Sequence, residues 1–353
     1  MTPTRHDRAS AERVVLGHGG GGELMNKLIR EHVLGPLLND LLSPLDDGAV
    51  LPQPNRDLVF TTDSYVVTPL EFPGGDIGRL AVAGTVNDLA VMGAVPTALS
   101  LALILEEGLP FDVLDRIMAS IASTAKEAGV VIVTGDTKVI ERRVMADRAG
   151  RSVNDGLFIN TAGVGTLRGD ARLDLSRAQP GDAILINGAI ADHGLAVMST
   201  RSGIEFETEL RSDAAPLNHL LAKLFESGVD VKFLRDATRG GLAGVLADIS
   251  ETCGLTIEIE EASVPLTPTA HHAAEMLGLD PLTCANEGKV VCVVADGDAD
   301  RALDALRADR LGRQAVRIGS ISDVQPPLVE LRTRVGGKRV VQRPYGEELP
   351  RIC

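Results

Sequence analysis

The stretch from Ile77 to Met92 is apolar around most of the circumference of the helix that its residues favour. Such a helix has no polar face to present to water, so it has to be buried by other parts of the chain. At 353 residues the chain is too long for one ordinary core and suits two domains. The sequence therefore predicts a globular protein with a buried helix early in its first domain.

Two polar residues, Asn87 and Asp88, lie inside this apolar run. A buried carboxylate without a partner is costly, so pairing or metal coordination is expected. No lysine lies near Asp88 in the sequence. We therefore expect magnesium, which takes carboxylate and phosphate oxygens.

Strand-like and helical segments alternate along the rest of the chain, which predicts an α/β (α+β) fold. A polar, turn-rich segment over 167–180 places the boundary between domains 1–165 and 166–339. The expected strands cover 57–63, 99–105, 130–134, 157–164, 181–187, 231–234, 255–260, 289–295, 315–318, 328–333 and 338–342, and the expected helices after the buried one cover 112–128, 216–225, 242–252 and 299–308.

Glycine clusters precede two of the helical patterns. Gly19, Gly20 and Gly21 stand before the first one, where backbone N–H groups can approach a phosphate closely. The alternative interpretation of this glycine cluster, a flexible hinge, is equally open. The spacing fits neither Gly-x-Gly-x-x-Gly nor the P-loop, so the usual dinucleotide and P-loop interpretations do not apply. The turn 235–241 leads into another helix N-terminus that favours anions.

Several carboxylates stand at turns or strand ends. Asp47 belongs to an Asp-Asp-Gly turn and Asp63 ends a strand, and each is ordinary by itself. The strand 130–134 runs into Gly135, Asp136, Thr137 and Lys138, which predicts a carboxylate and an ammonium group at one sheet edge. A solvated turn is the alternative.

Composition excludes several classes of function. A net charge of -14, 3% aromatic residues and no tryptophan argue against nucleic acid as a partner. The four cysteines lack Cys-x-x-Cys spacing, which argues against a zinc site or a disulfide framework. No apolar run is long enough for a membrane span and the start lacks a signal-peptide core, so we expect a cytoplasmic protein.

The printed sequence ends in Cys353, after a segment 340–353 that we expect to be a mobile tail. Two X-Pro pairs disfavour helix, so these residues span up to roughly 46 Å at about 3.3 Å each. The thiol is then expected to have little steric protection and to carry a group between sites. A frayed tail that ends in cysteine by chance is the alternative.

The motifs together resemble the HypE family, the carbamoyl dehydratases that make the cyanide ligands of NiFe hydrogenases. The likeness covers nearly the whole chain and includes the glycine cluster, DDGAV, TTDSYVV, FPGGDIGRLAVAGTVNDLAVMGAVP, VTGDTK, DGLFINTAGVG, GDAILING, DHG, RDATRGGL, ANEGK and the terminal PRIC. The wider superfamily, with selenide water dikinase and thiamine-phosphate kinase, shares only part of this set.

The resemblance implies a two-domain aminoimidazole ribonucleotide synthetase-like (PurM-like) fold, a homodimer, and ATP with Mg²⁺ bound near the dimer interface. It implies HypF as carbamoyl donor and a HypC and HypD scaffold as acceptor of the cyano group. Ala237 for a usual proline, Gly20 for a common serine and a long 140–155 loop depart from the pattern. The residues carried over as cofactor-binding are Gly19, Gly20, Gly21, Asp47, Asp63, Asn87, Asp88, Gly135, Asp136 and Asp236, and the five aspartates among them are the metal candidates.

The implied reaction turns a thiocarbamate on Cys353 into a thiocyanate, with ATP phosphorylating the oxygen so that it leaves. Glu287 is carried over as the acceptor of nitrogen protons, and Lys138 as a group that steadies phosphoryl charge or acts as a second base. A surface salt bridge between Glu287 and Lys289 is the bland alternative. A different ATP-dependent enzyme of the superfamily has no use for Cys353, and a non-enzymatic adaptor has no use for the carboxylates.

Overall fold

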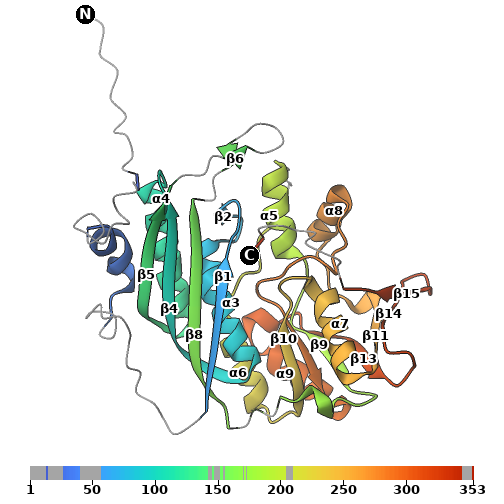
Figure 1. Cartoon of the computed structure of the whole chain (residues 1–353). Coiled ribbons are helices and arrows are strands. Elements are labelled where there is room, and N and C mark those ends of the chain that lie inside the picture. The colour runs from blue at the N-terminus through green and yellow to red at the C-terminus, as the bar shows by residue number, and fades with distance from the viewer. Residues whose placement is uncertain are drawn as a thin grey trace, which may run out of the picture.

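The computed structural model describes residues 13–14, 27–39, 57–141, 145–146, 152–153, 156–169, 171, 173–203, 210–343 and 352–353. The expected phosphate-binding residues Gly19, Gly20 and Gly21 and the expected metal ligand Asp47 lie outside these ranges. Two α/β units stand side by side, and the C-terminus lies between them (Figure 1). The predicted α/β fold with two domains is thus what the chain adopts.

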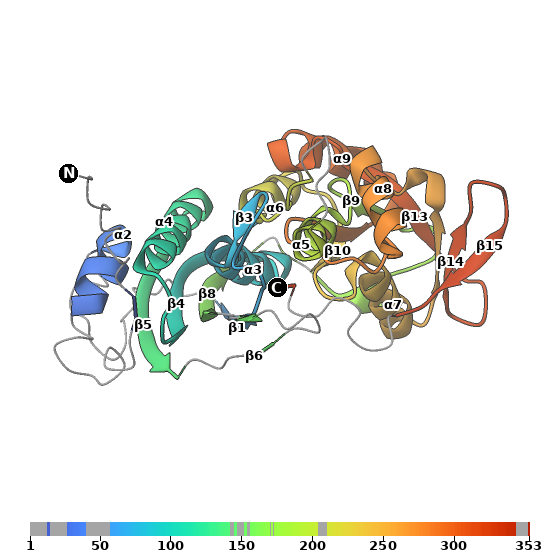
Figure 2. The same ribbon diagram turned by 90° about the horizontal axis from the view of Figure 1, so that it is seen from above.

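The first domain is a four-stranded sheet with helices on one face. Its strand order is β1-β8-β4-β5, with only the β4–β5 pair parallel. Helices α3 and α4 pack against each other on the same side of this sheet (Figure 2). The bounds are β1 (Leu58–Tyr65), α3 (Ile77–Val91), β4 (Ala94–Glu106), α4 (Phe111–Ala128), β5 (Val131–Ile140) and β8 (Leu157–Leu167), with the short pieces α2 (Gly35–Leu37), β2 (Glu71–Phe72), β3 (Gly75–Asp76), β6 (Met145–Ala146), β7 (Ser152–Val153) and a π-helical turn Ile29–Leu34.

Helix α3 is buried as its sequence predicts. It contacts β1, β4 and β8 on one side and α6 and β10 of the second domain on the other. Gly163 of β8 permits the close approach to the sheet, because a Cβ there would lie 2.8 Å from Thr85 Cγ2 and 2.9 Å from Leu89 Cδ1. The helix is therefore the shared core of the two domains, which explains why it has no polar face.

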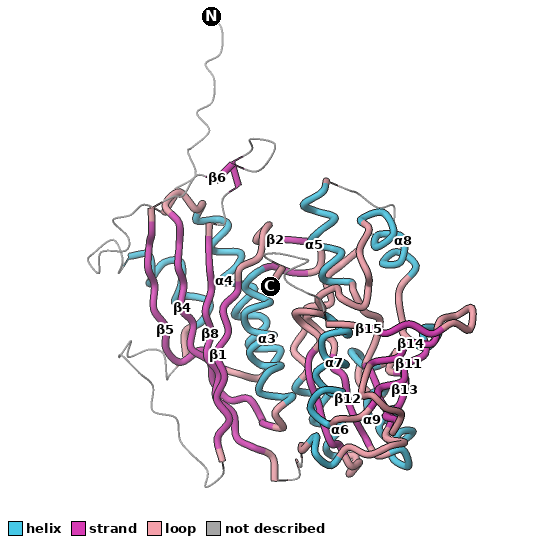
Figure 3. The backbone as a smooth tube through the Cα atoms, turned by 45° about the vertical axis from the view of Figure 1, so that its right-hand side comes forward, coloured by secondary structure: helices cyan, strands magenta, loops and turns pink. Residues whose placement is uncertain are grey.

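The second domain is built on a seven-stranded sheet of order β10-β12-β9-β13-β11-β14-β15. Helices follow most of its strands along the chain, and they pack beside the sheet (Figure 3). The bounds are β9 (Ala183–Ile186), α5 (Asp192–Ser202), α6 (Asn218–Glu226), β10 (Val231–Asp236), α7 (Gly241–Cys253), β11 (Thr256–Glu260), α8 (Pro268–Leu277), β12 (Val290–Val294), α9 (Ala299–Arg307), β13 (Val316–Ser322), β14 (Val329–Arg332) and β15 (Lys338–Val341), with 3-10 turns at Leu175–Arg177, Glu261–Ser263, Asp296–Asp298 and Arg310–Gly312.

The predicted elements of the second domain are present, but two helices were missed. Helix α5 is buried on most sides and α8 is rich in alanine, so neither shows a strong amphipathic pattern. Among the described residues, no helix combines the length and apolar character needed to cross a membrane.

Two predicted boundaries fall inside strands. β5 continues to Ile140, so Gly135 to Lys138 lie within the strand and not at its end. The strand is at the edge of the sheet, where polar side chains can stay exposed, and this hid the continuation from the sequence pattern. The expected start of the tail at residue 340 falls inside β15, where Val340 and Val341 pair with β14. The predicted domain limits at residues 165 and 339 each separate two residues from the strand in which they fall, β8 and β15 respectively.

Segment 212–217 joins the two domains along α3. Asn87, which is only 1% exposed, donates from Nδ2 to Ala215 O at 3.2 Å and to Glu287 O at 3.4 Å, and its Oδ1 accepts from Leu217 N at 2.7 Å. Arg79 Nε donates to Ala214 O at 2.6 Å. Asn87 is thus committed to backbone groups of the second domain, which favours a structural role, and cofactor binding by Asn87 stays a prediction.

We expect Asn87→Ala to lower the free energy of unfolding by about 2–3 kcal/mol, because buried backbone groups lose their partners. Urea unfolding at 25 °C measures this change, and Asn160→Ala on the other face of the sheet serves as the control. Unchanged stability together with weakened ATP binding would restore the cofactor role of Asn87.

Candidate active site

A cavity of about 290 Å³ lies between β1, α3, the turn after β10 and the loop before β12. It collects side chains that are far apart in the sequence and includes most of the predicted acidic residues that the structure describes. Its lining residues are Thr62, Asp63, Tyr65, Gly84, Asp88, Asp236, Thr238, Arg239, Glu287 and Cys353.

The aspartates of this cavity repel one another. Asp88 accepts a hydrogen bond from Thr61 Oγ1 at 3.0 Å, yet burial and the charge of Asp63 raise its pKa above the usual value. Burial and the charge of Asp88 raise the pKa of Asp236 to about 7. A bound cation would relieve this repulsion, so the donor set suits a divalent ion.

The geometry sets a limit on how such an ion is held. No group of three His, Cys, Asp or Glu side chains within the described ranges is arranged to hold a metal by itself. Magnesium commonly uses one or two carboxylates and completes its shell with water and substrate phosphates. The aspartates of the cavity therefore fit Mg²⁺ that is bound together with a nucleotide.

Glu287 is the most unusual group in the cavity. It is 2% exposed, and its Oε1 has no hydrogen-bond partner. Burial, followed by the charges of Asp213 and Asp236, raises its pKa well above the usual value. The alternative prediction, a non-catalytic surface salt bridge between Glu287 and Lys289, is wrong, because Lys289 Nζ pairs with Asp213 Oδ2 at 2.8 Å. A buried carboxyl group with a raised pKa and one oxygen without a partner is a candidate for proton transfer with a ligand.

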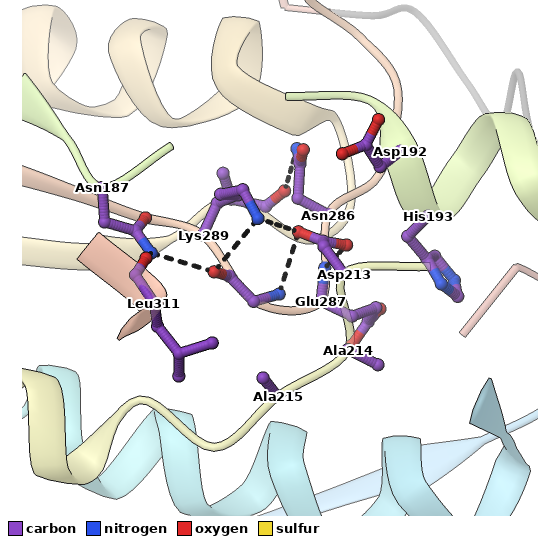
Figure 4. Close-up of polar contacts among 12 residues, drawn as sticks. Asn187, Asp192, His193, Asp213, Ala214, Ala215, Asn286, Glu287, Lys289 and Leu311 are labelled. Atoms are coloured by element: carbon purple, nitrogen blue, oxygen red, sulfur yellow. Dashed lines mark hydrogen bonds and ion pairs between the residues drawn. The ribbon is translucent and has the colours of Figure 1, made fainter. Parts of the chain in front are cut away.

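Asp213 fixes the loop that carries Glu287 (Figure 4). Its carboxylate accepts from Glu287 N at 3.1 Å and from Gly288 N at 3.2 Å, in addition to the lysine. Lys289 holds the pKa of Asp213 below its usual value despite burial. Gly288 is required for this approach, because a Cβ there would lie 2.1 Å from Asp213 O.

Cys353 lies inside the cavity. Arg239 Nε is 3.4 Å from its Sγ, and Val66 N donates to Cys353 O at 3.1 Å. Burial and the charge of Glu287 raise the pKa of the thiol to about 12, so the docked thiol is protonated at neutral pH. The prediction of an unprotected thiol is wrong for this arrangement, because Ile352 is 4% exposed and packs into the core beside it.

Asp136 and Lys138 are not part of the cavity of their own chain. They pair with each other at 2.8 Å on β5, and they project from the face of the sheet that points away from α3. Three strand spacings, roughly 14 Å in total, separate β5 from β1. The predicted set of five metal-binding aspartates is thus divided into Asp63, Asp88 and Asp236 in the cavity, Asp136 elsewhere, and one outside the described residues.

Sequence reasoning missed four residues that shape the site. Tyr65 lines the cavity, Arg239 contacts the thiol, Asp213 holds the glutamate loop and His193 contacts the tail. Signals for two of them were present, because Arg239 follows Asp236 in the glycine-rich turn and His193 stands in the DHG motif. No sequence signal pointed to Asp213, since a single aspartate in a polar stretch belongs to no motif that would indicate a role.

Known proteins with similar sequences and structures share this architecture. The models "AIR synthase related protein, N-terminal domain" and "AIR synthase related protein, C-terminal domain" match residues 45–167 and 179–329. Carbamoyl dehydratase HypE of Cupriavidus necator is 46% identical over 97% of this chain and 95% of its own.

Two solved structures extend the comparison. Hydrogenase maturation protein HypE in complex with ATP has a TM-score of 0.89 and 43% identity, covering 96% of this chain and 99% of its own. A HypE-HypF complex contains a chain with a TM-score of 0.75 and 43% identity, covering 92% of this chain and 100% of its own. The likeness therefore includes both domains.

The raised pKa of Asp236 predicts a pH-dependent cost. The folded state holds this proton up to about pH 7, whereas the unfolded chain releases it near pH 4, so wild-type stability falls as pH rises through this window. In buffer with a chelator, Asp236→Asn should raise the melting temperature by a few degrees at pH 8 and by a clearly smaller amount at pH 5.

Asp309→Asn is the matched control, because Lys223 lowers the pKa of Asp309 and the opposite sign is expected at pH 8. Scanning calorimetry at both pH values measures the two variants. A lower melting temperature for Asp236→Asn at pH 8 would show that the carboxylate is stabilised by contacts other than those described.

Proposed function

The chain belongs to the HypE family of carbamoyl dehydratases, and from this premise we propose that it dehydrates a carbamoyl group carried on Cys353. The observation that carries the proposal is the position of this thiol, in an acidic cavity beside a buried glutamate whose Oε1 has no partner. The reaction uses ATP, and it converts the thiocarbamate to a thiocyanate with release of ADP and phosphate.

The residues of the cavity suit each part of this reaction. The carbamoyl oxygen attacks the γ-phosphorus of ATP and ADP leaves. The carbamoyl nitrogen then gives up two protons in total as the phosphorylated oxygen departs, which leaves a carbon–nitrogen triple bond. Glu287 lines the same cavity as Cys353 and is assigned the role of proton acceptor, which it takes up as a carboxylate once a bound cation offsets the acidic charges that raise its pKa.

The acidic residues are assigned to ATP and its cation. Asp63, Asp88 and Asp236 would hold Mg²⁺ together with phosphate oxygens. When bound, the ion would supply positive charge to the phosphoryl oxygens and would lower the pKa of Glu287, which burial and the neighbouring carboxylates raise. Arg239 holds the thiol end of the carrier in place.

A homodimer is part of the proposal. The face of the first sheet that points away from α3 exposes apolar side chains, and Phe60 is 70% exposed. Lys138 projects from the same face, too far across the sheet to reach the thiol of its own chain. A second copy packed on this face brings Lys138 toward the partner's cavity, where it would steady phosphoryl charge. The exposed apolar residues of this face include Leu58, Phe60, Val95, Ile104 and Val131.

The proposed partners follow from the reaction. A carbamoyltransferase has to load Cys353, and the HypE-HypF complex supports HypF in this role. HypC and HypD are proposed as the scaffold that receives the cyano group. We propose a cytoplasmic location, because ATP is the co-substrate. Another ATP-dependent reaction of the superfamily is disfavoured, since it leaves the docked Cys353 without a purpose.

The function is tested by following the mass of the carrier cysteine. After incubation with HypF, carbamoyl phosphate and ATP, Glu287→Gln should retain the carbamoyl mass on Cys353, whereas the wild type loses water to give the cyano mass. Mass spectrometry of the intact protein measures both. Glu258→Gln on β11 should behave as wild type, and Cys353→Ala should bind ATP without gaining either mass. Wild-type conversion in Glu287→Gln would overturn the assignment.

The dimer is tested by placing a charge on the exposed sheet face. Phe60→Glu should shift the protein from dimer to monomer in sedimentation velocity, because an apolar contact is replaced by an ion without a partner. Met276→Glu is the control, since Met276 is 64% exposed on α8 and lies in the other domain. A monomeric wild type at micromolar concentration would contradict the proposed dimer.

A further inference from the structure

His193 contacts the tail from the second domain. Its ring is completely buried, and Nε2 is 2.7 Å from the carbonyl oxygen of Ile352. A carbonyl only accepts, so Nε2 carries the hydrogen and Nδ1 is the acceptor of the neutral ring. Ser212 Oγ donates to Nδ1 at 2.8 Å and accepts from Ala214 N at 3.1 Å. Both ring nitrogens of His193 and the Ser212 hydroxyl therefore have partners, and these partners select the tautomer of the imidazole that carries its hydrogen on Nε2.

The histidine is fixed to the loop of the catalytic glutamate. It lies in the first turn of α5, between two residues that bind that loop. Ala191 N donates to Asn286 Oδ1 at 2.8 Å, and Gly194 N donates to Ala285 O at 3.0 Å. Ala191 adopts φ 74°, which is rare for a residue with a side chain and indicates that the turn is held by its surroundings. The imidazole and Glu287 therefore belong to one rigid unit.

The tail is held on its other side by the first domain. Val66 N donates to Cys353 O at 3.1 Å, and Ile352 is buried in the core between the domains. The Phe72 ring and the imidazole pack edge to face, with ring centroids 5.3 Å apart. These contacts leave the thiol pointing into the acidic cavity, while the backbone before it is captured by the histidine.

We propose that His193 is a positioning residue, which recognises the docked tail through the Ile352 carbonyl and sets the Cys353 thiol in the cavity that Glu287 lines. Because it reads a backbone group, it holds the tail whether or not the thiol carries a group. The catalytic purpose of this contact rests on the proposed function, whereas the docking itself does not. A test on the unmodified protein without ATP separates the two.

The test measures the rate at which iodoacetamide alkylates each cysteine, by mass spectrometry of peptides. In the wild type the docked, protonated thiol should react slowly. His193→Met has no donor at Nε2 and should expose the tail, raising the Cys353 rate by about tenfold, which is the effect of one net hydrogen bond. His193→Gln places an amide donor near the same position and should react within about threefold of wild type. Methionine and glutamine have side chains of similar length, so the two variants differ mainly in the presence of the donor.

Internal and external controls report on the fold. Cys292 is fully buried in β12 and should stay unreactive in both variants. His219→Met removes another imidazole that contacts a backbone carbonyl, Glu127 O at 3.0 Å, and should leave Cys353 slow. A wild-type Cys353 rate in His193→Met overturns the proposal. If His193→Met also exposes Cys292, the glutamine variant decides: slow alkylation of Cys353 supports the proposal, and a tenfold rise with Cys292 protected overturns it.

Discussion

The hydrogen bonds of Asn87 to the backbone of segment 212–217 are the constraint on which the site depends. One buried amide satisfies a carbonyl and an N–H of the second domain and lies 3.4 Å from the carbonyl of Glu287. Because buried backbone groups need partners, the two domains cannot slide along α3 without breaking these bonds. The cavity is made of residues from both domains, so its shape is set by this seam.

The same segment also supports the reactive groups. Successive residues of it bind the imidazole that contacts the tail, the loop of the glutamate, Arg79 and Asn87. Asp213 is held as a carboxylate by Lys289, and its charge in turn raises the proton affinity of Glu287. A single stretch without helix or strand thus couples domain packing to the chemistry of the cavity.

The cavity carries an electrostatic cost that its ligands are suited to remove. Asp63, Asp88, Asp236 and Glu287 line a small volume, with Arg239 as the cation beside the thiol. Burial and repulsion among acids raise the pKa values of Asp88, Asp236 and Glu287, and a nucleotide-bound cation would lower them again. A cavity of this kind favours the loaded state over the empty one, and the docked tail completes its wall.

The sequence by itself determined the buried helix α3, the order of most strands and helices, and the residues of the acidic cavity that belong to recognisable motifs. These features are local: an apolar run predicts burial, alternation predicts a strand, and a motif fixes residue identity at known spacing. Only the tertiary structure decided which of these residues meet. Asp136 was expected to bind the metal together with Asp88, and Lys138 to act on the phosphoryl group. Both lie on the face of the sheet that points away from α3, because strand register and pleat direction depend on pairing partners far away in the sequence. His193 and Asp213 acquired their roles in the same way, since each acts through a contact with residues 74 or more positions distant.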